Sequence, residues 1–223
     1  MTPQIDIWQW IAYALPGLGI LLAWAVRSRR PMFIVLVSSL LVSQLLGMHT
    51  LLGLGTLLLL LLCALVIARE HQLPLAAELP WPKQVCYPKA WYIASVIVFL
   101  VLLVALSAHL APGIKNILYL WQYRLGPDVV PMDYYLNFDK PYVALMLAML
   151  FVTPADSGAW RLVGKSLGFY AALMLPPIFV LAMVTGLVNF DPKIPDTFGV
   201  WAYSNLLYTC VAEEILFRGL LLA

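Results

Sequence analysis

The chain alternates long apolar runs with short polar connections. A helix that spans a bilayer needs about 20 mostly apolar residues, and six runs come near that length: residues 8–26, 32–48, 50–68, 91–110, 167–188 and 198–222. A seventh and shorter run covers residues 138–153. The pattern predicts an all-α fold, a polytopic transmembrane helical bundle with about seven spans, in which residues 1–223 form a single membrane domain.

The run at 138–153 is too short to cross a bilayer easily. Its dozen apolar residues make a helix of about 20 Å, whereas the hydrocarbon core is about 30 Å thick. The segment therefore thins the bilayer, gains helical turns from residues 134–140, or enters without crossing. If it crosses, the loops hold eight Lys and Arg on one side and four on the other; if not, the split is seven to five. Cytoplasmic loops are enriched in Lys and Arg, so the sharper split favours crossing, with the N-terminus outside.

Two further segments have residue patterns that predict their structure. Between residues 114 and 125, apolar side chains recur at helical spacing with polar ones between them, which predicts an amphipathic helix in the outer membrane interface. The alternative is that this stretch is part of a long loop. Pro176 and Pro177 lie inside an apolar run and predict a kink in that helix.

The composition indicates that the protein surface faces lipid. Hydrophobic residues make up 63% of the chain and charged residues 11%, against about 25% charged residues in a soluble domain. The first apolar run lacks a basic leader and a cleavage site, so it is expected to be a retained membrane helix. The basic residues are spread among loops, which does not indicate nucleic-acid binding. The partner that composition predicts is the lipid bilayer.

The last apolar run contains two adjacent carboxylates, Glu213 and Glu214, followed by Arg218. A charge inside a bilayer costs about 2.5–3.5 kcal/mol and usually pairs or takes part in chemistry. Glu214 and Arg218 are four apart and share a helix face, which leaves Glu213 turned about 100° away from that pair.

A polar stripe leads to the unpaired carboxylate. Asn205 and Thr209 precede Glu213 at four-residue spacing, and such a stripe should face the bundle interior or a water-filled crevice. Counted along a perpendicular helix, Glu213 lies about three-quarters of the way across, in a partly desolvated position on the cytoplasmic side. The alternative is an ordinary ion-pair network at the interface.

The pattern Glu213-Glu214-x-x-x-Arg218, followed by Gly219, resembles the first signature of the CPBP family. This family comprises CAAX prenyl endopeptidases and bacteriocin-processing or self-immunity proteins, also called glutamic-type intramembrane proteases. The resemblance implies an intramembrane endopeptidase in which Glu213 activates the attacking water, with Glu214 and Arg218 in support. It also implies a multi-pass protein located in the bacterial inner membrane. Its substrate would be a membrane-associated or lipid-modified peptide or protein. Zinc is invoked for some members, and no zinc-ligand set is visible in this chain, so the metal is left open.

The later signatures of the family, Phe-x-x-x-His and His-x-x-x-Asn/Asp, do not occur in this sequence. His49, His71 and His109 lack those neighbours and are interpreted as loop or interface histidines. The chain is therefore expected to be the N-terminal part of a longer CPBP-type protein, inactive as it stands.

Two other functions remain open at this point. One is a non-catalytic membrane immunity or scaffold protein, in which the Glu213, Glu214 and Arg218 cluster only locks helices together. The other is a transporter subunit with Glu213 as a proton relay, which would need a water path to both faces.

Overall fold

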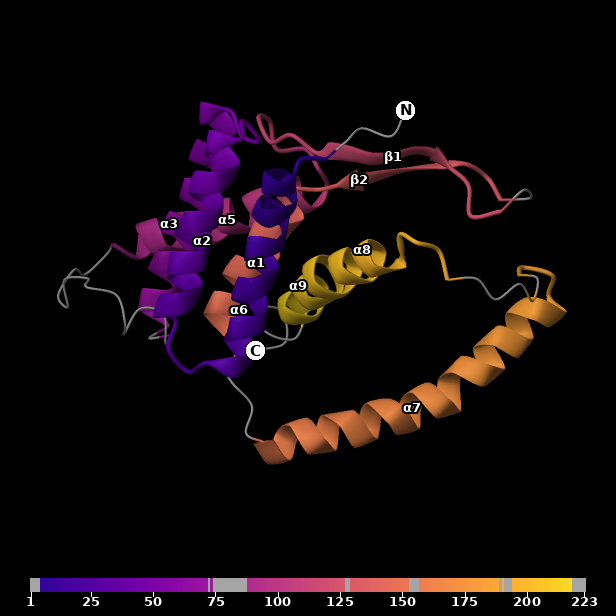
Figure 1. Cartoon of the computed structure of the whole chain (residues 1–223). Helices are drawn as coiled ribbons and strands as arrows, with labels where there is room; N and C mark the ends of the chain where they lie inside the picture. The colour runs from indigo at the N-terminus through magenta and orange to yellow at the C-terminus, as the bar shows by residue number, and fades with distance from the viewer. Residues whose placement is uncertain are drawn as a thin grey trace.

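The computed structural model describes residues 5–71, 73, 88–126, 129–152, 157–188, 190 and 194–217. Most of these residues are helical, and Figure 1 shows a compact group of helices, a hairpin across one end of it, and one long helix set apart. The helices are α1 (Ile7–Ala25), α2 (Arg30–Leu45), α3 (Leu51–Glu70), α5 (Lys89–Ser107), α6 (Lys140–Phe151), α7 (Ser157–Val184), α8 (Phe198–Tyr203), η1 (Ser204–Cys210) and α9 (Val211–Ile215).

Most of the apolar runs form helices close to their predicted bounds, whereas α7 begins at Ser157, well before the predicted start at residue 167. Among the described residues, four helices are long and apolar enough to cross a membrane: Ile7–Ala25, Leu51–Glu70, Lys89–Ser107 and Arg161–Val184. Helices α2 and α6 are apolar but shorter. These lengths and compositions support a mostly helical membrane protein with four candidate spans of full length among the described residues, so the seven predicted spans are not confirmed.

Helix α6 is the centre of the bundle. Every residue from 141 to 150 is buried, and α1, α2, α3, α5 and α9 all contact this helix. An apolar run of 10–14 residues is typical of a buried core helix, which explains why α6 is only 12 residues long. Of the three alternatives for this segment, the gain of helical turns from residues 134–140 does not occur over most of that stretch, because residues 132–136 form a strand.

Buried charged side chains hold both ends of α6. At its N-terminus the Asp139 side chain, which is almost fully buried, accepts hydrogen bonds from the Lys140 backbone N–H (2.8 Å) and from His109 Nδ1 (2.6 Å). At its C-terminus the buried Arg29 donates to the carbonyl of Val152. An anion at the first turn and a cation at the last both complement the helix dipole.

The connection between α5 and α6 is a β-hairpin, so the described chain is mostly helical and not purely so. Strands β1 (Ile117–Tyr123) and β2 (Met132–Leu136) pair antiparallel, where an amphipathic interface helix was predicted over 114–125. The run of Ile, Leu, Tyr and Trp in β1 has high strand propensity, and β2 supplies the backbone partners that this stretch alone could not show. Figure 1 shows the hairpin lying across the end of the bundle.

Helix α7 has no buried side chain between Arg161 and Val184. It continues through Pro176 and Pro177 and lies apart from the other helices in Figure 1. Phe169, Leu173 and Phe179 are each more than half exposed. A helix that is apolar on all sides without protein around it is compatible with lipid and not with water.

Candidate functional site

The last helix of the described chain carries the predicted site. Residues 198–217 form one helical stretch in which α8 is followed by a π-helical segment, η1, and then by α9. The stretch contacts α6 and α1 and runs obliquely to α1 in Figure 1. The polar stripe of Asn205, Thr209 and Glu213 lies on this helix, as the sequence predicts.

The π-helical segment makes the stripe straighter than an α-helix would. A π-helix closes i→i+5 hydrogen bonds, so each residue turns by less than the 100° of an α-helix, and residues four apart stay closer to one face. The same geometry brings together residues five apart. Tyr203 and Tyr208 are such a pair, and their hydroxyls lie 3.2 Å apart.

The two tyrosines connect this helix to α1 by hydrogen bonds. Tyr203 donates to the carbonyl of Ala14 at 2.8 Å. The Tyr208 hydroxyl accepts from the backbone N–H of Gly17 at 3.2 Å and donates to the carbonyl of Tyr13. These bonds join residues nearly 200 positions apart and fix which side of the last helix faces the bundle interior.

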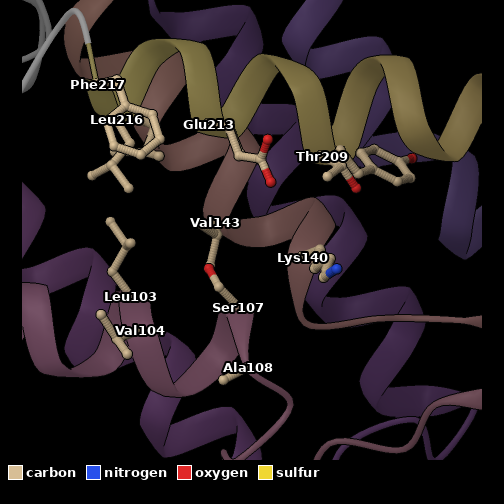
Figure 2. A pocket seen from close by; sticks show the side chains of 13 residues that line it. Leu103, Val104, Ser107, Ala108, Lys140, Val143, Thr209, Glu213, Leu216 and Phe217 are labelled. Atoms are coloured by element: carbon tan, nitrogen blue, oxygen red, sulfur yellow. The ribbon is translucent and has the colours of Figure 1, made fainter.

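Glu213 lines a cavity of about 390 Å³. Figure 2 shows its carboxylate and the Thr209 side chain directed into the space between the last helix, α5 and α6. Most of the wall is apolar, but Ser107 of α5 and Lys140 of α6 add a hydroxyl and an ammonium group. No hydrogen bond or ion pair of Glu213 lies within the described part of the chain. The side chain is exposed, so the described residues do not desolvate it as the sequence led us to expect.

The cavity of Glu213 reaches toward the hairpin end of the bundle. It is lined by the last turns of α5, through Leu103 and Ser107, and by α6 from Lys140 to Leu147. The hairpin connects these ends of α5 and α6. Because the last helix is oblique, the depth counted along a perpendicular helix stays a prediction.

A second, smaller cavity of about 80 Å³ adjoins the same stripe. Asn205 lines it, Thr209 lines both cavities, and Tyr208 and Lys140 are likewise shared. The remaining wall carries hydroxyl and amide groups from α1, η1 and the hairpin strand β2 with the residue after it, among them Tyr13, Ser204 and Asn137.

The other predicted site residues are only partly described. The Glu214 side chain is exposed and does not line the Glu213 cavity. Arg218 lies outside the described residues, so its pairing with Glu214 stays a prediction. Residues 216–217 are again π-helical, which keeps residues four apart close to one helix face.

The three histidines are placed as loop and interface residues, as predicted. His49 is buried, with Nε2 3.5 Å from the Tyr142 hydroxyl, and His71 Nε2 lies 2.8 Å from the Tyr92 hydroxyl. His109 binds Asp139. Among the described residues no three His, Cys, Asp or Glu side chains gather closely enough to hold a metal ion.

Sequence reasoning missed Lys140 and Ser107 as cavity residues. Both lie at the end of an apolar helix; Lys140 directly follows Asp139, and Ser107 precedes His109 by two residues. A signal for Lys140 was available, since it is a charge directly before the buried run of α6. Nothing in the sequence indicates that α5 and α6 face the last helix at that level.

Comparison with known proteins adds no relative, because no family model, curated protein or solved structure matches this chain.

Proposed function

We propose that this chain is the membrane part of an intramembrane endopeptidase in which Glu213 activates a water molecule. The observation that supports this proposal best is the placement of the Glu213 carboxylate. It points into a largely apolar cavity beside the hydroxyl of Thr209 and has no ion-pair partner among the described residues. A carboxylate that served only to lock helices together would be expected to face a cation across a helix contact.

The cavity offers groups for each part of a hydrolysis. Glu213 acts as general base and takes a proton from water while the water oxygen attacks the peptide carbonyl carbon. The tetrahedral species then breaks its C–N bond, and the proton passes from the carboxyl group to the departing amine. Thr209 and Ser107 can orient the water or the peptide by hydrogen bonds, and Glu214 and Arg218 support the helix end, as the CPBP resemblance implies.

The walls suit a substrate that is itself lipid-soluble. Leu103, Val143 and Leu216 give the cavity an apolar surface that can receive the side chains of a membrane-associated peptide or the lipid of a modified protein. The proposal includes a location in a bacterial inner membrane. It also includes seven crossings, since α6 is enclosed by protein and need not match the thickness of the lipid.

The proposal is tested by Glu213→Gln in the protein expressed at its full natural length. Membranes of cells with the wild type and with the variant are compared by mass spectrometry of newly formed peptide termini. Loss of a general base should reduce cleavage by about 10²–10⁴-fold, so termini present with the wild type should vanish with Glu213→Gln. Glu70→Gln is the matched control, because Glu70 ends α3 at the other end of the bundle. Termini that persist with Glu213→Gln would favour the immunity or scaffold function instead.

A further inference from the structure

The two cavities beside the last helix share lining residues. Three residues line both of them: Lys140, Tyr208 and Thr209. The polar stripe runs the length of the pair, with Asn205 in the small cavity, Thr209 in both, and Glu213 in the large one. A continuous line of polar side chains therefore connects the two spaces along one helix face.

The small cavity is suited to water. Tyr13, Tyr134 and Ser204 present hydroxyl groups to it, and Asn137 and Asn205 present amides. Its volume of about 80 Å³ leaves room for at least two water molecules at about 30 Å³ each. A buried water needs two to four polar partners, and these walls supply them.

Lys140 stands where the two cavities meet. Its ammonium group makes no ion pair among the described residues, although apolar residues from α5 and α6 surround the larger cavity. Removing an ammonium group from water without a partner is costly. The position of this cation is therefore best explained if water reaches it.

The two cavities differ in the polarity of their walls. Beyond Val143, the described lining of the larger cavity is apolar, with Leu147 of α6 and Leu216 and Phe217 of the last helix. Toward the hairpin, polar side chains border the small cavity, namely Tyr134, Tyr135 and Asn137.

We infer that the two cavities form one hydrated passage, which brings water to Glu213 from the hairpin end of the bundle. The inference rests on the proposed function only for what that water does there. The passage itself is a property of the fold. Five basic residues of the described chain lie at the opposite end, namely Arg27, Arg29, Arg30, Arg69 and Lys89, against Lys115, Arg124 and Lys140 near the hairpin. Since basic residues favour the cytoplasmic side, the water enters from the non-cytoplasmic side.

Cysteine accessibility tests the passage without a substrate. Thr209→Cys and Asn205→Cys are made one at a time in the full-length protein lacking its native cysteines, and sealed vesicles of each orientation are treated with a membrane-impermeant cationic methanethiosulfonate. Only a hydrated cysteine forms the reactive thiolate. The chain provides the control, because Cys210 neighbours Thr209, is exposed, and lines neither cavity. A protein with Cys210 as its sole cysteine measures the rate of a neighbouring position outside both cavities.

We expect Thr209→Cys and Asn205→Cys to react at least about tenfold faster than Cys210. They should react from the side that also labels Val130→Cys in the hairpin connection, where Val130 is 81% exposed. Reaction from the opposite side only, no reaction from either side, or a rate equal to that of Cys210 would each overturn the passage. Single elution peaks in detergent confirm that the variants are folded.

The passage and the proposed function can fail separately. If Thr209→Cys reacts as expected but cleavage persists in Glu213→Gln, the passage stands and the protease assignment falls. If cleavage requires Glu213 but Thr209→Cys reacts only from the other side, the water comes by a different route.

Discussion

His49 is a buried titratable residue outside the spanning helices. It lies between α2 and α3 with 3% of its surface exposed, and its ring meets Tyr142 of α6 edge-to-face at 5.5 Å. Tyr142 also meets the hydroxyls of Ser39 at 3.1 Å and Ser43 at 2.8 Å. Burial lowers the pKa of His49 from 6.5 to about 4, because a charged imidazolium is poorly solvated there.

The lowered pKa of His49 predicts acid sensitivity. The unfolded chain binds a proton at this residue below pH 6.5, whereas the folded chain does so only below about pH 4. The free energy of unfolding therefore falls as the pH drops between those values, by about 2 kcal/mol at pH 5 from this residue alone. Thermal unfolding in detergent at pH 7.5 and pH 5 should show this loss, and His49→Leu should reduce it.

The exposed His71 serves as the comparison for His49. His71→Leu should leave the pH dependence of unfolding as it is in the wild type. If His49→Leu unfolded with the same pH dependence as the wild type, then protonation of His49 would not be the cause of the acid sensitivity.

At the scale of elements, the contact between α1 and the last helix orients the candidate site. Gly17 is the point of closest approach. A Cβ atom at this position would lie 1.9 Å from the Tyr203 hydroxyl and 3.1 Å from the Tyr208 hydroxyl. The absent side chain of Gly17 is thus what lets both tyrosines reach the backbone of α1.

Gly17→Ala should push the last helix away from α1. Overpacking of this kind costs about 1–3 kcal/mol, so the free energy of unfolding should fall and Thr209 should lose its fixed position. Gly55→Ala is the control, since a Cβ there meets no atom within 4 Å and alanine within a helix stabilises by about 0.5–1 kcal/mol. Denaturation of the two variants in detergent gives the comparison. Equal stability of Gly17→Ala and wild type would refute the contact.

Helices were predictable from the sequence because apolar runs of this length have few other stable forms in lipid. The hairpin was not, since the apolar and aromatic run in residues 117–123 is compatible with a helix as well as a strand, and only pairing with β2 decides between them. The π-helical turn was not predictable either. It depends on Tyr203 and Tyr208 meeting α1 together, and that is a tertiary contact.

At the scale of the whole molecule, the two ends of the bundle differ in charge and in architecture. One end carries the hairpin and the polar cavity, and the other carries Arg29, Arg69 and most of the remaining basic residues of the described chain. This asymmetry predicts that the hairpin lies on the non-cytoplasmic side. Because the cavity opens toward the hairpin end, the orientation of the bundle also decides from which compartment water reaches the site.

The orientation is checked with single cysteines in intact cells. Val130→Cys, in the connection between the strands, should react with an impermeant maleimide added outside. Glu70→Cys, at the end of α3, should react only after the membrane is permeabilised. The reverse result would place the hairpin in the cytoplasm and would contradict the charge argument.

The candidate site was predicted from the sequence in part. Helical spacing alone indicated that Asn205, Thr209 and Glu213 share an inward face, and all three line cavities. The depth of the site in the membrane stays a prediction, because the tilt of a helix depends on its neighbours. Lys140 and Ser107 became visible only once α5 and α6 were placed beside the last helix.

The enclosure of α6 has a consequence for biogenesis. A segment of 12 residues that touches protein on every side gains little from lipid as it leaves the translocon. We expect it to be retained until α1, α2, α3 and α5 have gathered to receive it. The hairpin that precedes α6 would then be drawn into place by the same event, so the polar passage would close late, after the surrounding helices are already in the membrane.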